Sequence, residues 1–280
     1  MDAQLKKQLQ KDAIEVRKMA LEGVYNAKSG HPGGSLSVAD ILTYLYMVKM
    51  NVDPQDPKKE DRDRFVLSKG HTAPALYGAL ALKGFFPRED IKTLRKPDSY
   101  LQGHPCMHKT PGVDMSTGSL GQGISAAVGM AVAAKVKGAD YTVYTALGDG
   151  EIEEGEVWEA AMFAAAKGLD NLVAAVDNNN LQIDGAITDV NSPYPIDEKF
   201  AAFGWNVICI DGHDFDQIED AYNKADQRNG KPTVIIAKTV KGKGVSYMEN
   251  QAGWHGKAPN DEQYAQAMDE LNAALAALDA

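Results

Sequence analysis

The sequence contains little cysteine. Cys106 and Cys209 are the only two among 280 residues, and they form no C-x-x-C pair. The first residues, MDAQ, do not open a signal peptide. Small secreted domains are rich in disulfides, whereas thiols in reducing compartments stay free. We therefore expect a cytoplasmic protein.

Basic residues are also scarce. Lysine and arginine total 29 against 39 aspartate and glutamate residues, which gives a formal net charge of −10. Nucleic acids and anionic membranes are bound through positive charge, so we expect neither as a partner. No apolar run approaches the ~18 residues that a membrane helix needs. A phosphate ligand must then be held by a metal ion, by histidines or by helix ends.

Two nucleotide-binding glycine motifs are missing around Gly148-Asp149-Gly150. The pattern G-x-G-x-x-G would need glycine in place of Glu153. The pattern G-x-x-x-x-G-K-[ST], read from Gly150, meets Glu156 where lysine must stand. Both a dinucleotide-binding fold and a P-loop are therefore disfavoured.

The sequence does contain many apolar residues, which make up 44% of the chain. This is enough for the core of one large α/β domain over residues 1–280, and a division into two domains is less favoured. Apolar runs with helical segments between them predict buried strands. The predicted strands are Phe65–Leu67, Tyr141–Leu147, Leu172–Val176, Trp205–Ile210 and Lys231–Ala237.

The central unit is a strand, a helix and a strand. The run Tyr141–Leu147 stops at Gly148, and the run Leu172–Val176 stops at Asp177, with one helical segment between them. A right-handed crossover of this length makes the two strands parallel, so their carboxyl ends lie at the same edge of the sheet. If the strands are neighbours, Asp149 and Asn179 lie roughly 5 to 10 Å apart.

A small cation fits between these residues. The Asp149 carboxylate, the Asn179 amide oxygen and a backbone carbonyl, for which Leu181 is our candidate, form an all-oxygen set that suits Mg²⁺ or Ca²⁺ rather than Zn²⁺. Diphosphate oxygens and water would complete an octahedral magnesium. Gly148 and Gly150 allow a sharp turn, and we expect the helix N-terminus behind them to favour an anion. The alternative is a tight turn whose nearby glutamates merely suit the helix dipole.

Four of the six histidines stand in glycine- or proline-flanked loops at predicted helix or strand ends: His31, His71, His104 and His255. If they converge on one sheet edge, they supply donors for a diphosphate and for sugar hydroxyls, and a proton shuttle near neutral pH. A zinc cluster is the rival use, but no HxH or HExxH spacing supports it. We interpret His108 and His213 as without a special role, and Ser35 as the N-cap of the helix after His31.

These motifs resemble those of a known family. The Gly148-Asp149-Gly150 turn and Asn179, about thirty residues apart, are similar to the thiamine diphosphate motif. Five further segments resemble transketolase in the order in which that family carries them. They are Lys28–Gly33, Ser68–His71, Gly103–Pro105, Thr117–Gly123 and His255–Pro259.

The resemblance implies a role for each matching residue. Asp149, Asn179 and the Leu181 carbonyl would ligate magnesium, with Ca²⁺ or Mn²⁺ as substitutes. His31, His104 and His255 would meet the sugar and serve catalysis. The residues that would contact the cofactor are His71, Gly118, Ser119, Leu120, Gly150, Asn179 and His255. Glu154 matches a glutamate of the family's cofactor region, and its implied place is at the contact with a partner domain.

The resemblance also implies a fold and an assembly. It predicts a doubly wound parallel sheet, the thiamine diphosphate-binding fold, with the cofactor at the carboxyl ends of the strands. It covers only the N-terminal, diphosphate-binding third to half of a transketolase. A second chain with the pyrimidine-binding domain would therefore complete the enzyme, as two copies of each in a heterotetramer.

The implied function is transfer of a two-carbon ketol unit from a ketose phosphate to an aldose phosphate, as in the pentose phosphate pathway. The alternative is the diphosphate-binding half of a deoxyxylulose phosphate synthase-like or 2-oxoacid decarboxylating enzyme, with which Lys241 to Gly244 is also compatible. A non-catalytic cofactor-binding protein is a third hypothesis. The identity of the sugars, and whether Lys241 and Lys243 touch them, stays open at this point.

Overall fold

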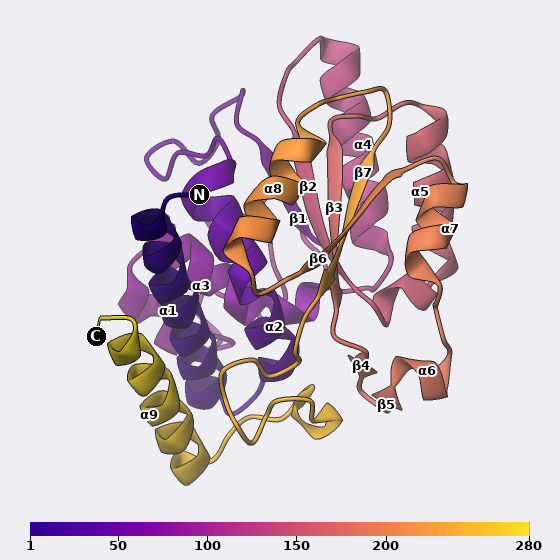
Figure 1. Cartoon of the computed structure of the whole chain (residues 1–280). Coiled ribbons are helices and arrows are strands. Elements are labelled where there is room, and N and C mark those ends of the chain that lie inside the picture. Colours follow the sequence, from indigo (N-terminus) through magenta and orange to yellow (C-terminus); the bar gives the residue numbers. More distant parts are fainter. Residues whose placement is uncertain (280) are drawn as a thin grey trace.

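The computed structural model describes residues 1–279, so residue 280, with which the predicted domain ends, lies outside the described residues. A five-stranded parallel sheet, in the order β1-β2-β3-β7-β6, runs through the molecule (Figure 1). Its strands are β1 Arg64–Leu67, β2 Val143–Gly148, β3 Leu172–Asn178, β6 Asn206–Asp211 and β7 Thr233–Lys238.

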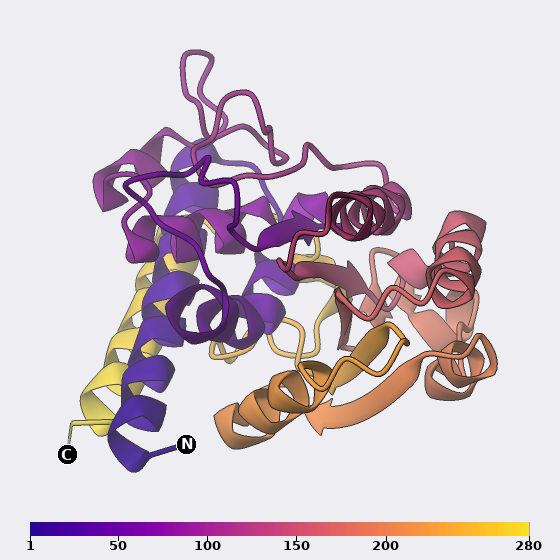
Figure 2. The same cartoon turned by 90° about the horizontal axis from the view of Figure 1, so that it is seen from above.

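Helices cover both faces of this sheet (Figure 2). One face carries α1 Ala3–Ala27, α2 Pro32–Tyr44, α3 Ala73–Lys83 and α8 Phe215–Ala225. The other carries α4 Gln122–Lys137, α5 Gly155–Ala166 and α7 Ile196–Ala202. A last helix, α9 Asp261–Ala277, packs along α1. The prediction of a doubly wound parallel sheet is therefore confirmed.

The inner strands β2, β3 and β7 are mostly apolar because both of their faces are buried, whereas the edge strand β6 is partly exposed. In β3, Val173 and Ala175 belong to the core under α1, α2, α3 and α8, whereas Leu172, Ala174 and Val176 belong to the core under α4, α5 and α7. This alternation follows the two-residue period of a strand.

The central unit is built as the sequence predicts. Strands β2 and β3 are parallel neighbours, and Gly148 pairs with Asp177 in their register. The residues that follow these two strand ends, Asp149 and Asn179, consequently leave the sheet at the same edge.

Three local predictions need correction. Helix α2 begins at Pro32 rather than after Ser35, because proline suits the first helical position, and the Ser35 hydroxyl instead donates to the His31 carbonyl at 2.7 Å. The segment after Asn179 contains an unpredicted hairpin of β4 Leu181–Gln182 and β5 Gly185–Ala186, followed by the short helix α6 Ile187–Val190.

The third correction concerns the glycine turn. A single 3₁₀ turn, Glu151–Glu153, separates Gly150 from α5, which starts at Gly155. The N-terminus of α5 therefore does not stand directly behind the turn. The reason is that Glu151 turns into the protein, where it is 3% exposed.

Remaining short elements are a π-helical turn, Leu45–Lys49, and 3₁₀ turns at Gly70–Thr72, Arg88–Thr93 and Ala252–Trp254. Asn260 and Gln263 form a capping box at the start of α9. Among residues 1–279, every helix is too short or too polar to cross a bilayer.

Candidate functional site

The four histidines of the glycine- and proline-flanked loops meet at the carboxyl edge of the sheet. The ring centres of His71 and His255 are 5.0 Å apart, and His31 lies 5.1 Å from His71 and 5.5 Å from His255. His104 stands at the rim, with its ring centre 6.3 Å from that of His31. Residues separated by more than two hundred positions in the sequence thus form one group.

These histidines are neutral at pH 7. Burial, with the nearby Lys241 ammonium, lowers the pKa of His255 to about 3, and burial with Arg95 lowers the pKa of His31 to about 4. Burial likewise lowers the pKa of His71, together with Lys69, and that of His104, together with Arg95. A neutral imidazole can donate one hydrogen bond and accept another, as sugar hydroxyls require.

One histidine atom lacks a partner. The Nδ1 atom of His31 is buried and makes no hydrogen bond within residues 1–279. Buried polar atoms in proteins are nearly always hydrogen-bonded, so this one favours a ligand at the site.

The three predicted metal ligands line one cavity of about 120 Å³, together with Gly150, His71, Leu120 and His255. The Asp149 carboxylate is 2% exposed and accepts hydrogen bonds from the Gly150 amide at 2.9 Å and from the Asn180 amide. The Asn179 side-chain oxygen accepts from the Leu181 amide at 3.1 Å. Within residues 1–279 there is no metal-holding cluster of three or more His, Cys, Asp or Glu side chains, which disfavours the zinc alternative.

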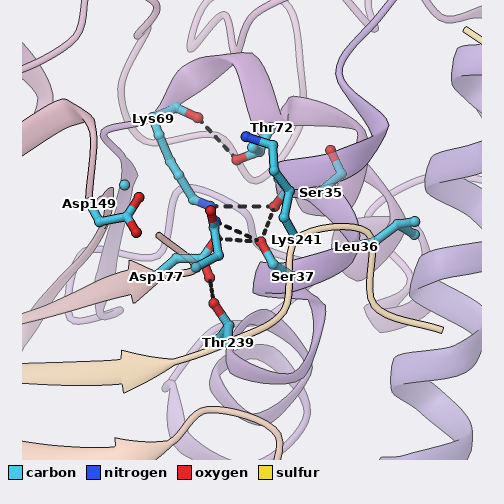
Figure 3. Close-up of polar contacts among 12 residues, drawn as sticks. Ser35, Leu36, Ser37, Lys69, Thr72, Asp149, Asp177, Thr239 and Lys241 are labelled. Atoms are coloured by element: carbon cyan, nitrogen blue, oxygen red, sulfur yellow. Dashed lines mark hydrogen bonds and ion pairs between the residues drawn. The ribbon is translucent and has the colours of Figure 1, made fainter. Parts of the chain in front are cut away.

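A buried ion pair that the sequence did not predict lies beside the cavity. The Lys69 ammonium pairs with the Asp177 carboxylate, and both side chains are almost fully buried. The Ser37 hydroxyl donates to the same carboxylate at 2.5 Å, and the Thr239 hydroxyl donates to its other oxygen (Figure 3). Although burial alone would raise the pKa of Asp177, these partners hold it below its ordinary value.

Asp149 forms no direct ion pair among the described residues, although the more distant Lys69 acts to lower its pKa. Burial and the neighbouring Asp177 raise the pKa of Asp149 to about 7, against an ordinary value near 4. A carboxylate with a raised pKa and two adjacent oxygen ligands is a site that a divalent cation would stabilise. The donor set therefore fits the predicted hard metal ion.

The sequence left open whether Lys241 belongs to the site. Its side chain is buried, and its ammonium donates to the Leu181 carbonyl and to Nδ1 of His255, both at 2.9 Å. Burial and the charge of Lys69 lower the pKa of Lys241 to about 8. Lys243 points elsewhere, 3.9 Å from Glu249.

Glycines bring the segments of the site into close contact. A Cβ atom on Gly33 would lie 2.9 Å from the Trp254 carbonyl and 3.1 Å from Cγ of Lys241. Gly118, with a φ of +155°, passes His104 so closely that a Cβ atom there would lie 3.2 Å from its ring. Only glycine allows such approaches.

Not every predicted cofactor residue reaches the cavity. Leu120 lines it, but Gly118 and Ser119 face an adjoining groove of about 370 Å³. Glu154 is exposed at the N-cap of α5 and is not part of the cavity wall. This position suits a contact with another chain better than a contact with a ligand in the cavity.

A larger hollow of about 900 Å³ opens beyond Asn179, along β6 and β7. Its wall includes His213, whose Nδ1 bonds to Asp40 at 2.7 Å and whose Nε2 accepts from the Val240 amide at 2.9 Å. Both nitrogens of His213 are thus used within the protein. None of the four clustered histidines lines this hollow, so we assign the chemistry to the smaller cavity.

Known proteins resemble this chain over almost its whole length. A family model described as transketolase, thiamine diphosphate binding domain, matches residues 9–274. The chain is 48% identical over 263 residues to the 6-deoxy-6-sulfo-D-fructose transketolase subunit SqwG of Clostridium sp. (strain MSTE9), which covers 94% of this chain and 96% of that subunit. It is 47% identical over 256 residues to an apulose-4-phosphate transketolase subunit from Phocaeicola vulgatus, covering 91% of each.

Single-chain relatives are longer. Human transketolase is 41% identical over 271 residues, which are 96% of this chain but 43% of the human protein. The crystal structure of transketolase from Campylobacter jejuni superposes with a TM-score of 0.89 at 34% identity, covering 99% of this chain and 46% of that one. This chain therefore spans nearly all of the separate subunits but less than half of the single-chain proteins.

The raised pKa of Asp149 leads to a prediction about pH and metal. A carboxyl group whose pKa is higher in the folded than in the unfolded chain stabilises the fold below pH ~4, and this stability is lost as the pH rises to about 7. Asp149→Asn removes this titration, although its NH₂ group must face the Gly150 or the Asn180 amide, which lowers the stability of the variant at every pH. In urea denaturation, the free energy of unfolding of the metal-free wild type should therefore fall between pH 4 and pH 8 by a few kcal/mol more than that of the variant, at about 1.4 kcal/mol per pKa unit.

Magnesium should remove this difference in pH dependence, because it stabilises only the chain with the Asp149 carboxylate. Asp184→Asn, an exposed substitution in the turn between β4 and β5, is the control and should behave like the wild type. A metal-free Asp149→Asn variant whose stability falls with pH as much as that of the wild type, or equal stabilisation of both by Mg²⁺, would show that the Asp149 carboxylate is not the group that Mg²⁺ stabilises.

Proposed function

The chain belongs to the transketolase family, and from this premise we propose that it is the diphosphate-binding subunit of a two-chain transketolase. One observation carries the proposal: the uncompensated Asp149 carboxylate and a group of neutral histidines share one cavity edge. The first element suits a metal with a diphosphate, and the second suits a polyhydroxylated substrate.

The cofactor of the family is thiamine diphosphate, which when bound supplies the thiazolium carbon that carries a two-carbon ketol unit from one sugar to another. We propose that Asp149, Asn179 and the Leu181 carbonyl hold a Mg²⁺ ion with the diphosphate, and that Ca²⁺ or Mn²⁺ can replace it. His71, Gly150 and the Gly118 to Leu120 backbone would contact the cofactor.

Lys241 belongs to the same group in this proposal. Its ammonium donates to the carbonyl that we assign to the metal, so a bound cation would compete with it at Leu181. A freed lysine ammonium in the same cavity could then donate to a phosphate oxygen.

The protonation state of His255 follows from its neighbour. The Lys241 ammonium can only donate, so Nδ1 of His255 accepts and the proton of the neutral ring resides on Nε2. His255 thus presents an N–H group for an oxygen of the ligand. We propose that His31 and His255 hold the oxygen that changes protonation when the carbon-carbon bond breaks, and that His104 holds the terminal hydroxyl of the donor.

The substrate is proposed from the relatives. Two of them are named for 6-deoxy-6-sulfo-D-fructose and apulose-4-phosphate, both of which are ketoses with an anionic group. We propose a ketose phosphate donor and an aldose phosphate acceptor, as in the pentose phosphate pathway. The named relatives favour ketol transfer over the deoxyxylulose phosphate synthase-like or 2-oxoacid decarboxylating alternative.

A partner chain completes the proposed enzyme. The cavity of about 120 Å³ is smaller than the ~300–1,000 Å³ of most small-molecule sites, so this chain holds only part of the cofactor. We propose that a C-terminal subunit with the pyrimidine-binding domain contributes the rest, in an assembly of two copies of each chain. The exposed Leu120 and Glu154, beside the cavity and its adjoining groove, support such a contact. We place the assembly in the cytoplasm, in keeping with two cysteines that are not paired.

His104→Ala should weaken use of hydroxylated donors more than cofactor binding. His104 lies at the rim of the histidine group rather than in the cavity wall, so it is placed for the sugar alone. We expect the donor KM to rise at least about tenfold, the scale of a lost buried hydrogen bond, with the KM for thiamine diphosphate within about twofold. His108→Ala, an exposed histidine in the same loop, is the control. An unchanged donor KM and kcat would remove His104 from the substrate site.

The chain alone should show no ketol transfer, and should gain it with the partner subunit. Purified chain, purified partner and their mixture would be assayed with xylulose 5-phosphate and ribose 5-phosphate, and separately with pyruvate and glyceraldehyde 3-phosphate. Only the mixture should turn over, and only with ketose donors. Turnover by a single chain that mass spectrometry shows to be free of a second polypeptide would contradict the proposal, as would activity with pyruvate alone.

A further inference from the structure

Glu151 is a buried acid to which the proposed chemistry assigns no task. It directly follows the Gly148 to Gly150 turn, and only 3% of it is exposed. Its Oε1 atom accepts hydrogen bonds from the Ser68 hydroxyl at 2.5 Å and from the Gly121 amide at 3.0 Å. Its Oε2 atom accepts from the Gly148 amide at 3.0 Å. Both carboxylate oxygens are therefore occupied by donors of the protein itself.

The three donors come from three separate loops, and each loop carries part of the proposed cofactor site. Ser68 follows β1 and precedes Lys69 and His71. Gly121 ends the segment of Gly118 to Leu120, and Gly148 is the residue before Asp149. One carboxylate thus joins segments that lie more than eighty positions apart in the sequence.

We propose that Glu151 is a positioning residue that fixes these three loops in the arrangement that binds thiamine diphosphate and its metal ion. The inference rests on the proposed function, because it assigns Glu151 a role toward that cofactor. The Glu151 side chain also lines the cavity, but its three hydrogen bonds all go to the loops, so we assign it to holding the loops and leave ligation of the metal to Asp149, Asn179 and the Leu181 carbonyl.

The packing of the loops supports this role. A Cβ atom on Gly70 would lie 2.6 Å from the Thr117 hydroxyl oxygen, and a Cβ atom on Gly123 would lie 2.5 Å from Cα of Ser68. Gly121 has a φ of +84°, and a Cβ atom there would lie 2.9 Å from Cβ of Glu154. The loops touch backbone to backbone, so a displacement of one moves the others.

The role requires a carboxylate and not merely a polar side chain. A carboxylate offers acceptor sites on both oxygens, whereas the amide of glutamine offers one oxygen and one NH₂ group. In Glu151→Gln, the NH₂ group must face a backbone N–H, either that of Gly148 or that of Gly121. Two donors that face each other leave a buried amide unpaired, which is costly although the shape is unchanged.

The first test is hydrogen exchange of the free full-length chain, followed by mass spectrometry. Glu151→Gln should speed exchange at least about tenfold in all three segments, residues 68–72, 117–123 and 146–150, because an unpaired donor loosens each of them. The matched control is Asp114→Asn, which removes a carboxylate that pairs with Arg62 at 2.6 Å and accepts from the Phe65 amide at 2.9 Å, away from the cavity. The control should loosen residues near Phe65 and leave the second and third segments as in the wild type.

The second test uses the complex reconstituted with its partner subunit. Glu151→Gln should raise the apparent KM for thiamine diphosphate, measured with MgCl₂ in excess, at least about tenfold, with kcat at saturating cofactor within about twofold of the wild type. A loss of stability alone would lower the melting temperatures of both Glu151→Gln and Asp114→Asn. It would not raise the KM for thiamine diphosphate while leaving kcat unchanged. Ser68→Ala, which keeps the carboxylate and both amide bonds, should give a smaller increase and serves if Glu151→Gln does not fold.

Two results would overturn the inference. One is exchange that rises in a single segment, or in none. The other is a KM for thiamine diphosphate in Glu151→Gln that rises no more than in Asp114→Asn. Failure of the proposed function itself is recognised separately, because the wild-type complex would then not respond to thiamine diphosphate.

Discussion

Two buried carboxylates stand at the ends of neighbouring strands, and only one of them is matched by a lysine. Lys69, Ser37 and Thr239 neutralise and fix Asp177. Asp177 lies close enough to Asp149 to raise the pKa of Asp149. The Asp149 carboxylate accepts hydrogen bonds only from backbone amides. A buried, charged carboxylate is unfavourable without a cation. The side-chain oxygen of Asn179 and the carbonyl of Leu181 line the same cavity. We propose that this imbalance gives the site its affinity for a divalent ion.

The rest of the site is arranged around that point by close backbone packing. Glycines at positions 33, 70, 118 and 123 remove the side chains that would separate the loops, and burial keeps the clustered histidines neutral. The result is a cavity that is charged at one end, where Asp149 lies, and suited to hydroxyl groups at the other. We propose that a second chain completes it, since this chain spans less than half of human transketolase and of the Campylobacter jejuni transketolase.

Much of this could be predicted from the sequence. The strand ends at Gly148 and Asp177 are marked by apolar runs that stop abruptly, and parallel crossovers oblige such ends to share an edge. The sequence suggested but did not require that the four loop histidines converge, and the structure brings them together. The capping box at Asn260 can be predicted from the sequence because its two residues are only three positions apart.

Contacts between side chains of distant segments could not be predicted from the sequence in this way. Lys69 with Asp177, and Lys241 with His255, depend on which side chains meet inside the fold, and no local pattern distinguishes them from surface charges. Glu151 is one of the glutamates near the turn that could merely suit a helix dipole, yet it points inward, where Gly148, Gly121 and Ser68 offer three donors. Helix α2 begins at Pro32 because a proline, not a serine, sets its first turn.

The central claim is that this chain holds the metal and diphosphate end of the cofactor and that the partner holds the other end. A crystal structure of the two-chain complex with thiamine diphosphate and Mg²⁺ tests it most directly. The account predicts a metal ion ligated by Asp149, Asn179 and the Leu181 carbonyl, with the pyrimidine ring of the cofactor against residues of the partner. A metal ion elsewhere, such as in the hollow along β6 and β7, or a cofactor enclosed by this chain alone, would contradict it.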